Sequence, residues 1–261
     1  MVVFFDIDGT IVDDRTQIIP PSAVRAVEEL GRRGHLAVVN TGRPFGHIDP
    51  RVRDMAFGAW VCGCGMELYF RGTCLRRRMP DRALCREVVR LARECGMSAL
   101  YEAPEGLYWD GGASLGPEEV REAERMKAKG FRVAELGTLP EPVFMKWITH
   151  DLPGCRREAF LARMERDFTC IDRGNTMVEY VLRGCSKAEG MEALLSHLGI
   201  SREETLAIGD STNDLPMFSV AAHTVCMGGG MEELKRRAEY VTAGVLDDGV
   251  ERALRHFGLL E

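Results

Sequence analysis

The chain has 261 residues, of which 45% are hydrophobic and 28% are charged, and this composition is typical of a globular protein. Asp and Glu number 40 against 34 Lys and Arg, which gives a net charge of −6. An acidic chain lacks the broad positive field that attracts nucleic acids and anionic membranes, so we expect neither as a partner. The chain also has no apolar run near the roughly 20 residues that a membrane helix needs.

The first residues and the cysteines bear on the compartment. Met1 to Asp6 contain neither the basic segment nor the small-residue cleavage site of a signal peptide. The nine cysteines are an odd number, scattered along the chain, which fits reduced thiols better than a set of disulfides. We therefore expect a cytoplasmic protein, and the sequence predicts no particular oligomeric state.

Strands and helices alternate at the start of the chain. Residues 2–5 form a short apolar run that ends in acid and glycine, which is typical of a buried strand. Residues 23–30 follow with apolar side chains at helical spacing, residues 36–39 predict a second strand, and a third is expected near Val61. This alternation predicts parallel strands joined by right-handed crossovers, and so an α/β fold.

The last third of the chain returns to the same pattern. Residues 187–198 predict a helix with one apolar face, and residues 205–208 predict a buried strand. Further strands are expected at Val225 and at residues 240–241, and further helices at residues 231–238 and 247–257.

The middle of the chain differs, because its strands come in adjacent pairs, which predicts an α+β insertion with an antiparallel sheet. Helices are expected at residues 81–95, 117–129 and 156–166, and strands at residues 99–102, 107–109, 143–149, 169–171 and 176–182.

Two carboxylates follow the first predicted strand. Asp6 and Asp8 lie two residues apart, so they point the same way if the strand continues, and ligands of open α/β sheets bind at this edge. Two anions so close together need a cation or a shared proton, and Mg²⁺ prefers carboxylate and carbonyl oxygens. Gly9 allows a sharp turn after them. An Asp-Gly pair is also common in simple hairpin turns, so both interpretations stay open at this point.

A second acidic pair, Asp210 and Asp214, follows the strand predicted at residues 205–208. Asp and Ser are favoured at helix N-termini, so this segment is also explained by a helix cap. The recurrence of carboxylate pairs at two strand ends of one predicted sheet favours a functional site.

Hydroxyl and cationic groups are expected at the same edge. Thr41, Gly42 and Arg43 follow the second strand and supply a hydroxyl, backbone N–H groups and a guanidinium. Lys187 lies in the first turn of a helix, where its charge opposes the helix dipole unless an anion is near, although for this residue taken alone an exposed helix position is the better explanation. A cation site beside anion-binding donors suits a phosphate group.

The chain resembles the haloacid dehalogenase superfamily of phosphohydrolases, specifically its Cof-type members. The four motifs of that superfamily appear in order as Asp6-Ile7-Asp8-Gly9-Thr10, Asn40-Thr41-Gly42-Arg43, Lys187 and Gly209-Asp210-Ser211-Thr212-Asn213-Asp214. The resemblance implies a Rossmann-like parallel-sheet core at residues 1–79 and 184–261, with an inserted α+β cap domain of the C2 type at residues 80–183.

By the same resemblance, Asp6 is the nucleophile that forms an aspartyl-phosphate, and Asp8 is the general acid and base. The other implied roles are Mg²⁺ binding by Asp6, the Asp8 carbonyl, Asp210 and Asp214, phosphate binding by Thr41, Gly42, Lys187 and Asn213, and substrate contact by Arg43.

The resemblance implies a Mg²⁺-dependent phosphomonoester hydrolase for a small phosphorylated metabolite, with a sugar or polyol phosphate ahead of pyridoxal phosphate or flavin mononucleotide. A phosphotransferase or mutase, or a non-catalytic sensor of a phosphometabolite, remain alternatives. Three positions, Cys64, Ala188 and Gly229, depart from the family pattern without removing a catalytic group. In the insertion, Lys146, Trp147 and His150 are candidates for leaving-group contact, although Trp147 also fits a core position and His150 a surface one.

Overall fold

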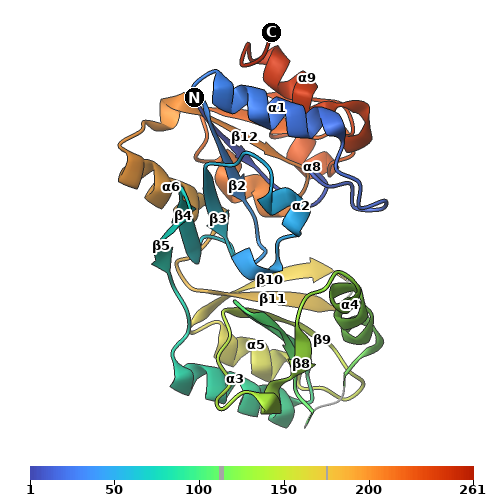
Figure 1. Cartoon of the computed structure of the whole chain (residues 1–261). Coiled ribbons are helices and arrows are strands. Elements are labelled where there is room, and N and C mark those ends of the chain that lie inside the picture. Colours follow the sequence, from blue (N-terminus) through green and yellow to red (C-terminus); the bar gives the residue numbers. More distant parts are fainter. Residues whose placement is uncertain (112–114, 175) are drawn as a thin grey trace. The chain divides into compact units, whose positions relative to one another are not determined.

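The computed structural model describes residues 1–111, 115–174 and 176–261, and its contacts divide the chain into two units (Figure 1). Unit 1 contains Met1–Gly42, Pro50–Arg77 and Ser186–Glu261, and unit 2 contains Arg43–Asp49 and Arg78–Cys185. The short segment Arg43–Asp49 follows the second predicted strand in sequence, and it makes its contacts within unit 2.

Unit 1 is built on an eight-stranded sheet in the order β14-β13-β12-β1-β2-β3-β4-β5. The six strands from β14 to β3 are parallel, and β4 and β5 extend the sheet as antiparallel strands. The predicted parallel core is thus confirmed, whereas β4 was not predicted. The strands of unit 1 are β1 (Val2–Phe5), β2 (Leu36–Asn40), β3 (Ala59–Cys62), β4 (Glu67–Phe70), β5 (Thr73–Arg77), β12 (Thr205–Gly209), β13 (His223–Cys226) and β14 (Tyr240–Val241).

Helices cover the sheet of unit 1. Apolar side chains of α6, α7 and α8 pack with β1, β2, β3 and β12 in one buried cluster, while α1 and α9 pack against each other (Figure 1). In α6 these are Met191, Leu194 and Leu195, which the helical spacing of the sequence predicted. The helices are α1 (Pro21–Arg32), α2 (Pro50–Arg53), α6 (Lys187–Leu198), α7 (Leu215–Phe218), α8 (Glu232–Lys235) and α9 (Gly249–His256), with 3₁₀ turns at Arg202–Glu204, Thr212–Asp214 and Val245–Asp247.

Unit 2 contains a six-stranded sheet in the order β10-β11-β9-β6-β7-β8. Its neighbouring strands are antiparallel, as predicted, except β7 and β8, which are parallel. Strand β8 was not predicted, because its three residues are too few to give a periodic signal. The strands are β6 (Ser98–Ala103), β7 (Gly106–Trp109), β8 (Val133–Glu135), β9 (Lys146–His150), β10 (Phe168–Gly174) and β11 (Met177–Leu182).

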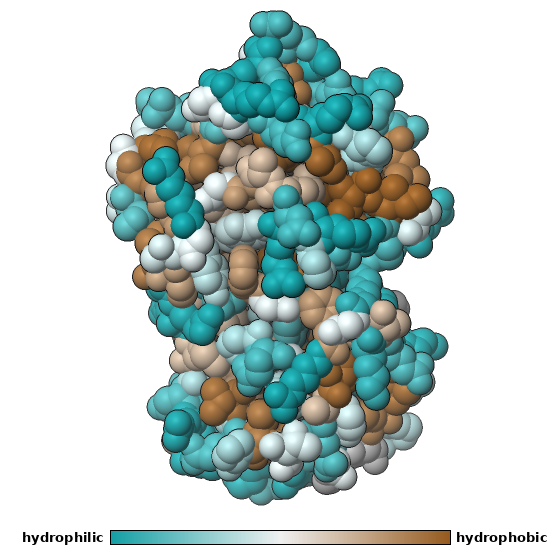
Figure 2. Space-filling view, viewed as in Figure 1, coloured by the Kyte–Doolittle hydropathy of each residue, from teal (hydrophilic) through white to brown (hydrophobic). Residues whose placement is uncertain are grey.

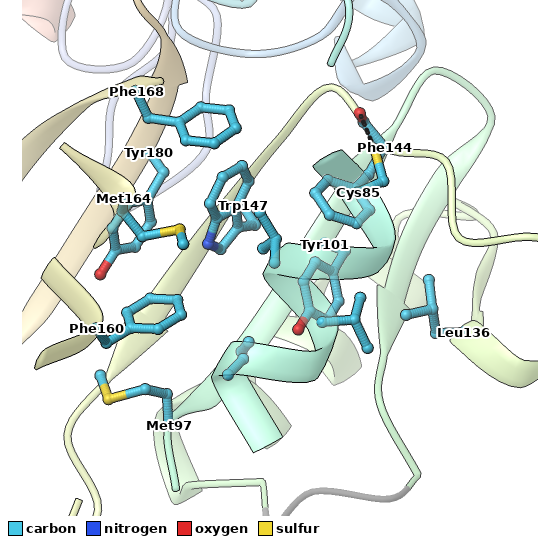
Figure 3. Close-up of a cluster of buried hydrophobic side chains, with 14 of the residues drawn as sticks. Cys85, Met97, Tyr101, Leu136, Phe144, Trp147, Phe160, Met164, Phe168 and Tyr180 are labelled. Atoms are coloured by element: carbon cyan, nitrogen blue, oxygen red, sulfur yellow. Dashed lines mark hydrogen bonds between the residues drawn. The ribbon is translucent and has the colours of Figure 1, made fainter. Parts of the chain in front are cut away.

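The main core of unit 2 is aromatic. Trp147 stacks on Tyr180 with ring centroids 4.9 Å apart and meets Phe168 edge-on at 4.5 Å (Figure 3). Side chains of α3 and α5 complete this cluster, and a smaller cluster joins α4 to β6 and β7 through Met126. The helices of unit 2 are α3 (Arg82–Cys95), α4 (Pro117–Ala128) and α5 (Arg157–Met164), with 3₁₀ turns at Phe45–His47 and Leu136–Thr138.

The surface drawn in Figure 2 is mixed in character. Hydrophilic residues cover much of the face drawn in Figure 2, with smaller apolar areas between them. Across residues 1–111, 115–174 and 176–261, no helix combines the length and the apolar character required to cross a membrane.

The start of α6 packs on the loop after β3 with backbone against backbone. A Cβ atom on Gly190 would lie 2.4 Å from Cγ1 of Val61 and 2.7 Å from Cα of Gly65, and one on Gly65 would lie 2.4 Å from the Ser186 carbonyl. These distances leave no space for a side chain, so the approach requires glycine at both positions. The contact fixes the first turn of α6 against β3.

We expect Gly190→Ala to lower the free energy of unfolding by about 1–3 kcal/mol, because the added methyl group overpacks this contact. The matched control is Gly31→Ala in α1, where nothing lies within 4 Å of the added Cβ. That variant should be neutral or more stable by up to about 1 kcal/mol, because Ala favours the helix. Urea unfolding measures both, and equal effects of the two substitutions would contradict the tight packing.

Candidate active site

The site begins where three neighbouring strands of unit 1 end. In the parallel register Phe5 of β1 pairs with Val39 of β2 and Ile208 of β12. The residues that follow these strands therefore leave the same edge of the sheet, as the sequence predicted for Asp6 and Asp210.

Three carboxylates converge at this edge. Asp6, Asp210 and Asp214 each offer an oxygen atom, and these atoms all lie within 4.8 Å of one another. Two glycines permit the approach: a Cβ on Gly9 would lie 2.4 Å from Oδ2 of Asp210, and a Cβ on Gly209 would lie 2.4 Å from Oδ2 of Asp214. The glycine of the Asp-Gly pair thus makes room for the second acidic segment, which a solvent-exposed hairpin turn would not require.

Lys187 neutralises part of this charge. Its Nζ lies 2.7 Å from Oδ1 of Asp6 and 2.6 Å from Oδ1 of Asp214, and the residue is 2% exposed. Asn40 donates from Nδ2 to the Lys187 carbonyl at 3.0 Å, which ties the end of β2 to the start of α6. The alternative that Lys187 is an exposed helix residue is therefore wrong.

Asp214 also closes the turn that follows β12. Its Oδ2 accepts hydrogen bonds from the backbone N–H groups of Asp210, at 2.9 Å, and Ser211, at 3.1 Å, and Ser211 completes a capping box. The helix-cap interpretation of this segment is thus correct, and it leaves the functional one open. One oxygen of Asp214 orients the turn that carries Asp210, and the other contacts Lys187.

Burial and neighbouring charges raise the pKa of two carboxyl groups. Burial is the largest cause for Asp6; Lys187 opposes it, Asp214 and Asp8 add to it, and the pKa reaches about 7. Burial, Asp6 and Asp214 raise the pKa of Asp210 to about 8. For Lys187 burial lowers the pKa, but Asp214 and Asp6 outweigh it, so the pKa is raised and the ammonium stays charged.

The donor set fits a hard divalent cation. It offers carboxylate oxygens, and Oδ1 of Asp210 is buried without a hydrogen-bond partner among the described residues. Oxygen ligands with an unsatisfied negative charge are what Mg²⁺ and similar ions bind. Asp6, Asp210 and Asp214 are the residues that could hold such an ion.

The remaining candidates on unit 1 lie in the turns after these strands. Thr41 is 1% exposed and its N–H donates to the Val61 carbonyl at 2.9 Å. Asn213 accepts from Oγ of Ser211 through Oδ1 at 2.8 Å. Asp8 is half-buried in the turn after β1. In this turn the carbonyl oxygen of the preceding residue, Ile7, accepts hydrogen bonds from three backbone N–H groups. Gly42 ends the first segment of unit 1.

Two groups near these residues were not predicted. Thr10 is fully buried, and its Oγ1 has no hydrogen-bond partner among the described residues. The amide of Asn40 holds Lys187 in place. Both residues stand in the quoted motifs, and their closeness to strand ends is the signal that would have singled them out. Arg43, the predicted substrate residue, opens the segment Arg43–Asp49 of unit 2.

Residues 3–254 match the sequence model of a family described as haloacid dehalogenase-like hydrolase. The chain belongs to this family. Relatives of this hydrolase in Bacillus subtilis include phosphatase YwpJ, 26% identical over 98% of this chain and 99% of that protein, and 5-amino-6-(5-phospho-D-ribitylamino)uracil phosphatase YitU, 24% identical over 98% and 97%. The solved subclass IIB sugar phosphatase BT4131 has a TM-score of 0.81 at 22% identity, with 99% of each chain covered.

These comparisons confirm the superfamily resemblance and the fold class, and with them the prediction of an enzyme. The motif residues that carried the resemblance, from Asp6 to Asp214, all lie within the matched range.

The three candidates in unit 2 of this hydrolase differ in their surroundings. Trp147 is fully buried in the aromatic core, so its core interpretation is correct (Figure 3). Lys146 is buried and paired with Glu179 and Glu102, and His150 contacts the buried Glu119. Burial raises the pKa of Glu179, but Lys146 and Arg173 outweigh it and lower the pKa to about 2.

Removing the ammonium of Lys187 leaves buried carboxylates without their partner. We expect Lys187→Met to lower the free energy of unfolding by about 3–5 kcal/mol at pH 8. The loss should be smaller at pH 6, because protons then neutralise the carboxyl groups whose pKa is raised. Lys235→Met removes a half-buried lysine paired with Glu232 at 2.9 Å and should cost less than about 1 kcal/mol. Urea unfolding of metal-free protein at both pH values tests this, and a loss independent of pH would contradict it.

Proposed function

We propose that this hydrolase is a Mg²⁺-dependent phosphomonoester hydrolase that works through an aspartyl-phosphate on Asp6. The observation that carries the proposal is the position of the Lys187 Nζ, 2.7 Å from Asp6 and 2.6 Å from Asp214, beside a third carboxylate of Asp210. This arrangement keeps a buried nucleophilic oxygen next to a fixed positive charge. A phosphate group, which carries negative charge on several oxygens, is the ligand that such a charge would hold.

Asp6, Asp210 and Asp214 supply the carboxylate oxygens for Mg²⁺, with the Asp8 carbonyl as a further ligand. When bound, the ion neutralises these carboxylates and withdraws charge from the phosphoryl oxygens. The buried Oδ1 of Asp210, which has no hydrogen-bond partner in the described parts of the chain, supports this assignment. The raised pKa values of Asp6 and Asp210 have the same physical origin, which is burial first and the neighbouring carboxylates second.

The chemical steps belong to Asp6 and Asp8. A carboxylate oxygen of Asp6 attacks phosphorus in line with the ester oxygen, a P–O bond forms to Asp6, and the bond to the leaving oxygen breaks. Asp8 gives its proton to that oxygen, so the product leaves as an alcohol. Asp8 then takes a proton from water, whose oxygen attacks the phosphorus and releases inorganic phosphate with Asp6 restored.

Donors around Asp6 hold the transferred group. Lys187 and the side chains of Thr41 and Asn213, with the backbone N–H of Gly42, would bind phosphoryl oxygens, where one preorganised donor contributes about 3 kcal/mol to the transition state. Unit 2, at residues 80–183 in the sequence prediction, would act as a C2 cap that excludes water and selects the leaving group. Arg43 would contact the substrate.

The substrate class follows from the relatives. YitU is named for a phosphoribityl compound and BT4131 for a sugar phosphate. Both carry the phosphate on a polyol or sugar chain, and we propose a small metabolite of this class. A screen for phosphate release over many phosphomonoesters with Mg²⁺ tests the proposal. Recovery of an isomerised phosphate ester would indicate a mutase, and binding without turnover would indicate a sensor.

Asp6→Asn should abolish phosphate release in that screen, by at least about 10³-fold, because the amide is no nucleophile for phosphorus. The fold should persist, since the amide occupies the space of the carboxylate. Asp54→Asn, at an exposed position of unit 1, is the matched control and should keep full activity. Hydrolysis retained by a clean preparation of Asp6→Asn would refute the covalent mechanism.

Mg²⁺ should raise the melting temperature more at pH 8.5 than at pH 6. The folded-state pKa values of Asp6 and Asp210, about 7 and 8, lie above the ordinary value of 3.8, so folding retains protons on these groups. This contribution to stability is present at low pH and is lost as the pH rises through 7 to 8. Mg²⁺ competes with these protons, so its binding strengthens over the same range.

Thermal unfolding in about 5 mM MgCl₂ and in EDTA gives two melting temperatures, and their difference measures this shift. Asp210→Asn should lose most of the Mg²⁺ effect. An equal effect of Mg²⁺ at both pH values, or an unchanged effect in Asp210→Asn, would contradict the assignment of the cation to these carboxylates.

A further inference from the structure

The first turn of α6 carries Lys187, and its position decides where the ammonium lies. Ser186 caps the helix by accepting from the N–H of Glu189 at 3.1 Å, but a lysine in the first turn opposes the helix dipole. Other contacts must therefore hold this turn against the carboxylates. Asn40 provides one of them, through the Lys187 carbonyl.

Arg76 provides a second contact. It lies in β5, the edge strand of the unit 1 sheet next to β4. Its Nη1 and Nη2 donate to the two carboxylate oxygens of Glu189, each at 2.7 Å. Its Nη2 also donates to the Gly65 carbonyl at 2.7 Å. One guanidinium thus joins the first turn of α6 to the loop after β3.

The two partners of Arg76 lie on the two sides of the glycine contact. Gly65 and Gly190 approach so closely that neither tolerates a side chain, and Glu189 is the residue before Gly190. Arg76 therefore bridges the contact that sets the distance between α6 and β3. A planar guanidinium that binds both oxygens of a carboxylate fixes angle as well as distance.

The ion pair between Arg76 and Glu189 contributes little to the stability of the fold. Arg76 and Glu189 are 25% and 33% exposed at their side chains, and the Arg76 Nε is buried without a hydrogen-bond partner among the described residues. A buried N–H without a partner opposes folding and offsets much of the gain from the ion pair. What the pair does supply is a fixed geometry for the turn that begins with Lys187.

We propose that Arg76 is a positioning residue for the reaction: through Glu189 and Gly65 it holds the first turn of α6 so that Lys187 Nζ meets Asp6 and the phosphoryl group. We call the contacts of Arg76 with Glu189 and Gly65 the clamp. The role of Arg76 in catalysis rests on the proposed function, whereas the clamp does not. Arg76 itself contacts neither Asp6 nor Asp214 in the hydrogen bonds and ion pairs of the described residues.

The variants Arg76→Met, Arg76→Lys and Glu189→Gln test the clamp. The matched control is the pair Arg163 and Glu87 of unit 2, in which Nε and Nη2 of Arg163 donate to the two carboxylate oxygens at 3.0 and 2.7 Å, with exposures of 22% and 35%. Arg163→Met therefore removes an equivalent ion pair away from α6.

With p-nitrophenyl phosphate and Mg²⁺ as probe, Arg76→Met should lower kcat roughly ten- to a hundredfold, as a small displacement of a catalytic group does, with a smaller change in KM. The kcat of Arg76→Lys should lie between those of the wild type and Arg76→Met, because lysine keeps the charge but loses the two-bond geometry. Adding Glu189→Gln to Arg76→Met should cost little more, because the two residues act as one unit. Arg163→Met should leave kcat unchanged.

Amide hydrogen exchange of the peptide covering residues 186–191 tests the clamp without any activity. It reports the bond from Gly190 N–H to the Ser186 carbonyl, at 3.0 Å. Exchange should be severalfold faster in Arg76→Met and unchanged in Arg163→Met. If the wild type hydrolyses no ester, the proposed function fails while this measurement still decides the clamp.

Wild-type exchange and wild-type kcat in Arg76→Met would overturn the inference. Equal losses of activity in Arg76→Met and Arg163→Met would also overturn it, because they would indicate a general loss of stability. If Arg76→Met does not fold, Arg76→Lys and Glu189→Gln carry the same two measurements, since both keep the size and polarity of the side chain.

Discussion

The site depends on a balance of charge in a buried space. Three carboxylates share the edge of one sheet with a single ammonium group within 2.7 Å of two of them. Buried charge is costly unless it is paired, so the excess negative charge raises the pKa of Asp6 and Asp210. The same excess gives the site its affinity for a cation. The same cluster therefore lowers the stability of the metal-free protein and raises its affinity for a cation.

Close backbone packing makes this cluster possible. Gly9 and Gly209 let carboxylates approach main chain at distances that any side chain would block, and Gly65 and Gly190 do the same for α6 and β3. Contacts that involve no charge thus help to place the charged groups. Packing of this kind tolerates little displacement, which suits a site where donors must meet a phosphoryl group at fixed distances.

Much of the site was predictable because it follows one rule of parallel sheets, that residues after neighbouring strands meet at one edge. Asp6, Thr41 and Asp210 each follow a strand with a clear apolar run. Lys187 lacked such a signal, since a lysine in a helix is usually exposed, and only the motif order assigned it. The three-residue β8 was missed because it is too short for a pattern. Arg76 in a run of three arginines gave no hint that it reaches Glu189, 113 residues away.

The order of the strands has a consequence for how the protein is made. In the finished sheet β1 lies between β2 and β12, yet β12 begins at Thr205, some two hundred residues after β1. A growing polypeptide therefore carries the apolar strand Val2–Phe5 with one edge unpaired until the whole of unit 2 and α6 have been synthesised. An unpaired strand edge favours association with other chains, so the unfinished chain is prone to aggregate until β12 is present.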